Sequence, residues 1–181
     1  MLTIKSGIFK RFNEPFFVNI NQSKSAVNNY INYEKSKKKD FFSFIKSSPV
    51  DFNEFTILDG NVVIDVEAKI LNPFRGAGKI RMNLHTGESN SDTHIKGEII
   101  PYNGLYLFTF YMVMGFLVLW AVLVLLVSSG VETLTMLALS WGVFPLVLIL
   151  IPFWYRRKLR IYRDCFIDIL NKMIIRNDTS M

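Results

Sequence analysis

The chain has 181 residues, half of them hydrophobic, and a formal net charge of +6. This length leaves no room for a second large domain, and the single cysteine, Cys165, excludes an internal disulfide. The composition is typical of a small membrane protein with one polar domain, and we expect Cys165 to be a free thiol in a reducing compartment.

The first residues, 5–20, mix β-branched and aromatic side chains with Pro15, which predicts an extended segment or an irregular hairpin. Residues 23–34 carry apolar side chains at helical spacing, so we expect a helix there. Ser23 or Ser25 would cap its first turn, because a hydroxyl can accept a hydrogen bond from a free backbone N–H.

A basic run follows this helix and consists of Lys35, Lys37, Lys38 and Lys39. Such a run usually marks a solvated surface. The alternative is attraction to anionic lipid on the inner leaflet, which contributes about 1 kcal/mol per basic residue held near the membrane. No aromatic platform accompanies the run, so nucleic acid is not the expected partner.

Alternating polar and apolar residues predict a small antiparallel sheet, mainly over residues 52–101. Asp59-Gly60 separates two alternating runs and is a hairpin signal, because both residue types tolerate positive φ. Val62, Ile64, Val66 and Ala68 would face the core. The expected strands lie at 52–58, 61–68, 79–85 and 94–100.

His85 and His94 flank a polar loop and would approach each other across the hairpin that it closes. With Asp92 or Glu88 they are weak candidates for a metal site, although paired histidines are more often solvent-facing strand ends. The chain contains neither Gly-x-Ser-x-Gly nor His-Glu-x-x-His, so we expect no catalytic residue and no cofactor.

Two uncharged apolar runs, about 104–127 and 133–155, follow the sheet and are joined by a loop at 128–132. Each run exceeds the roughly 20 residues that cross a hydrocarbon core, and in lipid each must be helical to satisfy its backbone. The sequence therefore predicts a transmembrane hairpin within residues 102–155. No ionisable residue lies inside the runs, which disfavours coupled transport.

Charge predicts the orientation of this hairpin. The joining loop has Glu132 as its only charged residue, whereas basic residues follow the second run directly. We therefore expect the loop outside and both termini in the cytoplasm. The expected interface residues are the basic Arg156, Arg157, Lys158 and Arg160 and the aromatic Tyr102, Tyr106, Trp154 and Tyr155.

Small residues in the second run offer a packing site. Ala138 and Gly142 form a small-x-x-x-small pair, and Pro145 is expected to bend the helix. The pair would pack the hairpin on itself or against a second copy of the chain. Both alternatives remain open at this point.

Residues 156–181 are predicted to form an amphipathic helix and a tail. The apolar stripe of this helix could lie on the inner leaflet, on the sheet or against another subunit. We favour the sheet, because the basic residues are concentrated in the first turns of the helix. The stripe consists of Leu159, Tyr162, Phe166, Ile169, Leu170 and Met173.

The run at 95–104, the two apolar runs and residues 153–157 together resemble small uncharacterised bacterial membrane proteins in which a short β domain precedes a helical hairpin. The resemblance covers about residues 52–175. It implies residence in the bacterial inner membrane and assigns no catalytic residue.

The sequence thus predicts an α+β membrane protein with a cytoplasmic domain at 1–101, and three functions remain. The first is a membrane-anchored binding or signalling module, either monomeric or oligomeric. Its partner would be an unknown cytoplasmic ligand or protein. The second is a small oligomeric effector that perturbs the membrane. The third, an enzyme at the lipid surface, is least favoured because convergent polar residues are missing.

Overall fold

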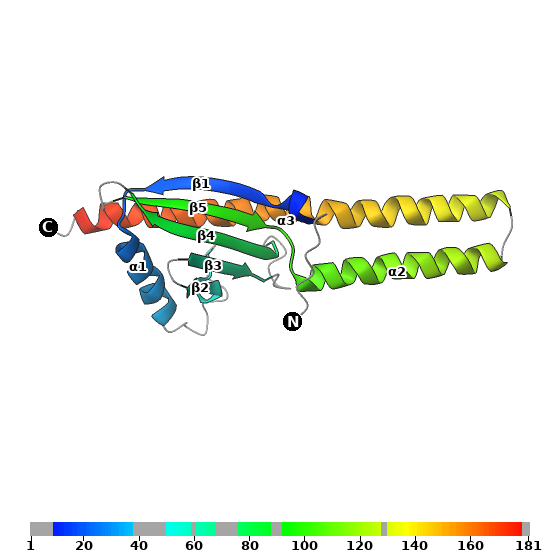
Figure 1. Ribbon diagram of the computed structural model, residues 1–181, viewed down its shortest axis with the longest axis horizontal. Coiled ribbons are helices and arrows are strands. Elements are labelled where there is room, and N and C mark those ends of the chain that lie inside the picture. Colours follow the sequence, from blue (N-terminus) through cyan, green and yellow to red (C-terminus); the bar gives the residue numbers. More distant parts are fainter. Residues whose placement is uncertain are drawn as a thin grey trace.

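The computed structural model contains a five-stranded antiparallel sheet and three α-helices, two of them long and apolar (Figure 1). It describes residues 9–37, 50–58, 61–67, 76–87, 92–127 and 130–178, with side chains in the last helix described as far as residue 172. The α+β prediction is confirmed. The Asp59-Gly60 turn, Lys38, Lys39 and Ala68 lie outside the described residues.

Four strands that are consecutive in sequence form an antiparallel meander, and a fifth strand from the N-terminal part completes the sheet. The strand order is β1-β5-β4-β3-β2. The strands are β1 (Glu14–Ile20), β2 (Phe55–Leu58), β3 (Asn61–Val66), β4 (Gly78–Thr86) and β5 (Thr93–Ile100).

Strand β1 is the extended segment expected near the N-terminus. It does not fold back into a hairpin of its own, because it pairs along its whole length with β5, from Glu14 opposite Ile99 to Ile20 opposite Thr93. Pro15 is compatible with this position, since β1 is an edge strand and has one side free of ladder hydrogen bonds.

Helix α1 (Lys24–Ser36) confirms the predicted N-terminal helix and its cap. The Ser23 side-chain oxygen accepts a hydrogen bond of 3.3 Å from the backbone N–H of Ala26. Val27 and Ile31, which lie on one face of the helix, are fully buried. Two short 3-10 helices complete the domain, η1 (Phe9–Phe12) and η2 (Phe52–Glu54).

The two long helices are α2 (Gly104–Val127) and α3 (Val131–Asp178). The second apolar run and the amphipathic segment, which the sequence predicts as two elements, form one uninterrupted helix of 48 residues. Pro145 and Pro152 both lie inside it. We refer to α2 together with residues 131–155 of α3 as the apolar hairpin.

The second half of α3 packs on the same face of the sheet as α1, as the apolar stripe predicts. The Phe166 ring is 1% exposed and lies 4.9 Å from the ring of Phe55, centroid to centroid. The Tyr162 hydroxyl accepts a hydrogen bond of 2.9 Å from the backbone N–H of Asp51. Residues of α1, α3 and all five strands therefore share one hydrophobic core.

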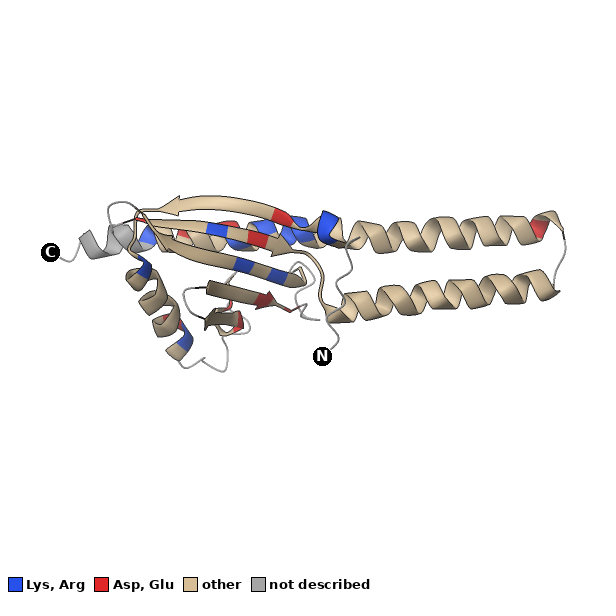
Figure 2. Cartoon of the chain, in the orientation of Figure 1, with Lys and Arg blue, Asp and Glu red and all other residues tan. Residues whose placement is uncertain are grey.

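The apolar hairpin extends away from this core. By length and composition, α2 and α3 are each apolar enough to cross a membrane, and only 6% of the most apolar window in each is buried. In Figure 2 the positions of charged residues lie on the domain, and the far end of the hairpin carries a red position in the first turn of α3, where Glu132 is located. An apolar helix in the core of a soluble domain would be mostly buried, so these helices do not serve that purpose.

Candidate functional site

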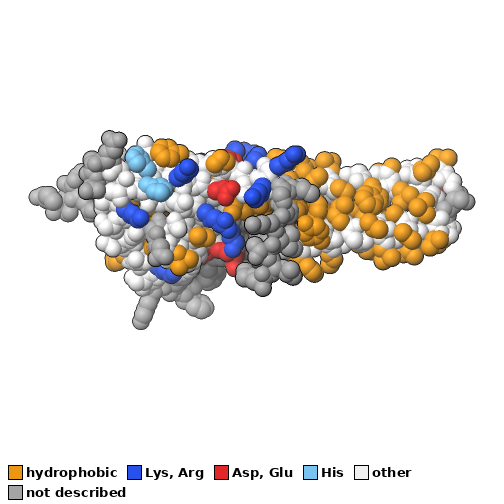
Figure 3. Space-filling view, viewed as in Figure 1, with side chains coloured by type: hydrophobic (Ala, Val, Ile, Leu, Met, Phe, Trp, Pro, Cys, Tyr) orange, Lys and Arg blue, Asp and Glu red, His pale blue; other side chains and the backbone are white. Residues whose placement is uncertain are grey.

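One face of the sheet covers the core, and the other carries polar side chains that point away from it. We call the second surface the open sheet face (Figure 3). Because strand residues alternate between faces, its members are fixed by the strand registers. They are Phe17 and Asn19 of β1, His94, Lys96 and Glu98 of β5, Lys79, Arg81, Asn83 and His85 of β4, and Asn61, Val63 and Asp65 of β3.

The structure brings the two histidines together at the end of this face remote from the apolar hairpin (Figure 3). His85 and His94 are directly opposite each other in the β4–β5 register. The His94 Nδ1 atom lies 2.6 Å from the Asn19 Oδ1 atom, and the His94 ring stacks on Phe17 at 5.8 Å. Because an amide oxygen can only accept a hydrogen bond, Nδ1 of His94 would be the donor in this contact.

Within the part of the chain that the structure describes, no third ligand completes a metal site with the histidine pair. Among the described residues, no group of three or more His, Cys, Asp and Glu side chains could hold a metal ion. Glu88, one of the predicted ligands, lies outside these residues.

Part of the charge on the open sheet face is paired. Lys79 forms an ion pair of 2.7 Å with Asp65, and the Asn13 side-chain amide donates a hydrogen bond of 2.9 Å to Glu98. Lys96 and Arg81 are exposed and make no ion pair with a described residue. These two cations are therefore available to a ligand of the face.

The helix η1 joins the domain to the apolar hairpin through aromatic contacts, and we call this region the junction. Phe9 is 4% exposed, and its ring lies 5.7 Å from Tyr102 and 5.2 Å from Phe110. Phe12 meets Phe153 of α3 at 5.3 Å, edge to face. Sequence reasoning missed this contact, because four residues of 3-10 helix carry no periodic pattern.

The junction also contains a hydrogen bond between the two long helices. Pro152 has no N–H, so the carbonyl of Leu148, four residues earlier, has no helical donor at that position. The Tyr106 hydroxyl of α2 donates to this carbonyl at 2.8 Å. The helix α3 can therefore continue through Pro152 without leaving a buried acceptor unsatisfied.

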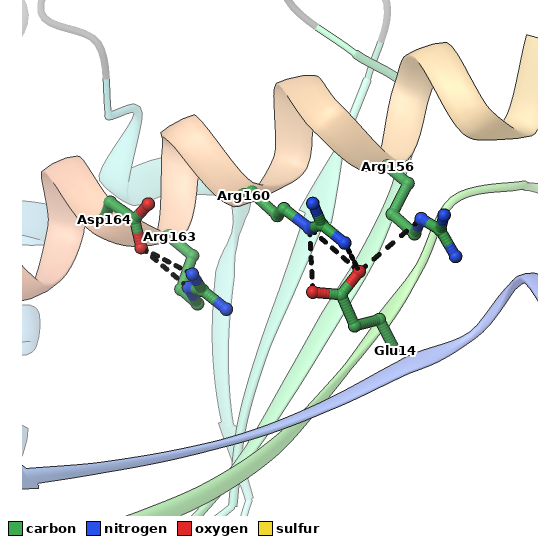
Figure 4. Close-up of polar contacts among 5 residues, drawn as sticks. All are labelled: Glu14, Arg156, Arg160, Arg163 and Asp164. Atoms are coloured by element: carbon green, nitrogen blue, oxygen red, sulfur yellow. Dashed lines mark hydrogen bonds and ion pairs between the residues drawn. The ribbon is translucent and has the colours of Figure 1, made fainter.

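The remaining interface residues predicted from the sequence also lie at the junction. Arg160 donates to both carboxylate oxygens of Glu14 through Nε and Nη2, and Arg156 approaches the same carboxylate at 3.5 Å (Figure 4). The hydrogen bonds that Arg160 donates to Glu14 raise the pKa of the Arg160 guanidinium above its usual value. Burial, followed by the charge of Glu98, raises the pKa of Tyr102.

Trp154 and Tyr155 lie against each other on α3 with ring centroids 5.5 Å apart. The Lys158 Nζ atom lies 5.8 Å from the centroid of the Trp154 ring, and Arg157 is exposed on the surface of the helix. All predicted interface residues thus surround the base of the apolar hairpin.

The small-residue pair of α3 does not pack the hairpin on itself. Ala138 and Gly142 are exposed, and a Cβ added at Gly142 would meet no atom within 4 Å. Pro145 is partly buried. Contact of the pair with a second copy of the chain stays a prediction.

Of the basic run, Lys35 lies in the last turn of α1 and Lys37 caps the end of that helix. Helix α1 lies at the end of the domain remote from the apolar hairpin (Figure 1). Lys35 donates a hydrogen bond of 3.1 Å to the Phe55 carbonyl. Lys37 pairs with Glu34 and lies 4.6 Å above the Tyr33 ring. Both lysines therefore make contacts within the domain.

Comparison of the chain with protein-family models, curated proteins and solved structures found no match. The class of protein is therefore defined by the fold and the site alone: a small α+β domain carried on a long apolar helical hairpin.

Proposed function

We propose that this protein is a membrane-anchored binding module, with the apolar hairpin in a bacterial inner membrane and the open sheet face as its recognition surface in the cytoplasm. The observation that carries the proposal is the division of the chain into two surfaces. One surface is an almost uncharged hairpin, and the other is a polar sheet face with exposed cations (Figure 2).

Membrane insertion is supported by the energetics of the hairpin. Burying a large apolar side chain is worth about 1.5–3 kcal/mol, and most of these side chains are exposed in the isolated chain. Between Glu98 and Glu132, and again between Glu132 and Arg156, the sequence has no Asp, Glu, Lys, Arg or His. A bilayer is the environment that stabilises such a surface.

The predicted orientation rests on the basic residues at the base of the hairpin. Arg156, Arg157, Lys158 and Arg160 lie at one end, and Glu132 is the only charged residue at the other. Because basic residues favour the cytoplasmic side, the domain would lie in the cytoplasm.

The continuous helix α3 supports a mechanical role for the anchor. Its first half belongs to the hairpin, and its second half carries Leu159, Phe166 and Leu170 of the domain core. The junction adds contacts from Phe9 and Phe12 to both long helices. The sheet would therefore be held at a fixed distance from the bilayer instead of moving on a flexible linker.

Recognition is assigned to the open sheet face because exposed cations and an exposed ring lie side by side on adjacent strands. Lys96 is the register partner of both Phe17 and Asn83. Phe17 is 62% exposed and presents an apolar ring beside this cation. This combination fits an acidic ligand with a flat apolar part, such as an acidic peptide segment.

A photo-cross-linking residue placed in the full chain in cells tests the proposal. At Asn83, on the open sheet face, it should form a discrete adduct that disappears when Arg81→Ala and Lys96→Ala are added. At Asn29, exposed on α1, the same residue should form no such adduct. Adducts of equal yield at both positions, or at neither, would refute recognition by this face.

A further inference from the structure

A second cluster of cations lies at the junction, where the domain meets the apolar hairpin. Within residues 9–14 and 153–160 there are six basic residues and one acid, Glu14. We call the six residues the basic belt: Lys10 and Arg11 of η1, and Arg156, Arg157, Lys158 and Arg160 of α3. In Figure 2 the blue Lys and Arg positions of η1 and α3 lie close together at this end of the domain.

Only part of the belt is neutralised within the chain. Glu14 is shared by Arg156 and Arg160. Lys10, Arg11 and Arg157 make no ion pair with any residue in the described ranges. Lys10, Arg11 and Arg157 are all exposed. The belt therefore carries a net positive charge that is exposed on the surface of the protein.

The side chains around the belt are of the kinds that proteins place at the level of lipid headgroups. Phe12 of η1 touches Phe153 of α3, which places Lys10 and Arg11 beside the last apolar turns of the hairpin. Trp154 is 47% exposed in those turns and lies beneath the Lys158 ammonium. A half-exposed tryptophan next to cations, at the end of an uncharged helix, matches the level where phosphates meet hydrocarbon.

We propose that the basic belt binds the phosphate groups of anionic phospholipids, with Lys10, Arg11 and Arg157 as the principal contacts. The inference rests on the proposed membrane insertion and adds a partner of defined chemistry to it. It also replaces the basic run at Lys35 and Lys37 as the lipid-binding element, because those lysines lie away from the hairpin and are engaged within the domain.

Quenching of Trp154 fluorescence by brominated lipids tests this proposal. In the full chain, Trp120→Phe and Trp141→Phe leave Trp154 as the only tryptophan. The protein is reconstituted in vesicles of brominated phosphatidylcholine or brominated phosphatidylglycerol mixed with the unbrominated lipids. The relative binding constant of the anionic lipid should exceed 1 severalfold at low salt. Each neutralised contact should lower it by up to about 5-fold.

The test variant is Lys10→Gln with Arg11→Gln and Arg157→Gln, which removes three positive charges. The control is Lys96→Gln with Arg81→Gln, which removes two positive charges from the open sheet face. The test variant should bring the ratio close to 1, and the control should leave it unchanged. Equal quenching by the two lipids in the unsubstituted chain, or an equal loss in the control, would overturn lipid binding by the belt. Absence of quenching by either lipid would overturn membrane insertion itself.

Discussion

The hydrogen bond from Tyr106 to the Leu148 carbonyl gives a sharp test of how the two long helices are held together. Tyr106→Phe removes the hydroxyl and keeps the ring, which lies 6.1 Å from Phe9. Because Pro152 removes the helical donor, the Leu148 carbonyl then has no replacement within α3. Hydrogen bonds between helices in membrane proteins are worth about 0.6 kcal/mol on average and up to about 1.7 kcal/mol. We expect Tyr106→Phe to lower the free energy of unfolding by an amount near the upper value, since the Leu148 carbonyl is left without a donor.

The assay is a double-mutant cycle with Pro152→Ala, measured by reversible unfolding of the full chain in mixed micelles. Alanine at position 152 restores the N–H that can bond Leu148, so Tyr106→Phe should cost much less in that background. The coupling between the two substitutions should be about 1 kcal/mol. An equal cost of Tyr106→Phe in both backgrounds would refute the argument that the tyrosine replaces the donor missing from proline.

Three further predictions concern the core, the junction and the hairpin surface. Phe166→Ala should destabilise the domain by about 3–5 kcal/mol because the ring is 1% exposed, and hydrogen exchange should quicken throughout β3 and β4. Ile161→Ala, on the exposed side of the same helix, is its control, and unchanged exchange in the Phe166 variant would contradict the shared core. Glu14→Gln should lower the free energy of unfolding by no more than about 1 kcal/mol, since the Arg160 side chain is 46% exposed. A larger loss in thermal unfolding would contradict the view that this ion pair is weakened by solvent. Gly142→Leu should leave the fold intact by circular dichroism and lower the mass of any oligomer in mild detergent, and an oligomer of unchanged mass would exclude this face as the contact.

Local patterns in the sequence were sufficient to predict the elements whose stabilising contacts are made by residues close in the chain. The α1 cap at Ser23 was readable because a capping hydroxyl acts within its own turn. The first apolar helix has the predicted bounds, Gly104–Val127, because an uncharged run ends where polar residues begin. The helical period placed Phe166 on the apolar stripe, and the concentration of basic residues in the first turns of the segment favoured the sheet as its partner.

Features that depend on contacts between distant parts of the chain could not be predicted from the sequence. The partner of β1 is β5, and a proline in the strand gives no indication of which edge it joins. The Phe9 contacts depend on where η1 lies in space, and no local pattern specifies that position. Similarly, the change from apolar to basic at Arg156 marks a change of environment, while the helix itself continues because its backbone bonds do not depend on side-chain charge.

The same distinction applies to the candidate site. The approach of His85 and His94 was predictable, because a hairpin brings its two flanks together. The open sheet face as a whole required the register of four strands, including β1. The positions of the small residues on α3 required the placement of α2, which leaves Gly142 in open space.

The central claim is that the hairpin crosses a membrane and leaves the domain in the cytoplasm, and labelling of single cysteines tests it most directly. In a Cys165→Ala background, Val131→Cys lies at the far end of the hairpin, where Val131 is 80% exposed, and Thr56→Cys lies on an exposed position of β2. In intact bacterial cells an impermeant maleimide should label position 131, and it should label position 56 only after the membrane is opened. Labelling of position 56 in intact cells, or equal protection of both positions, would contradict this account.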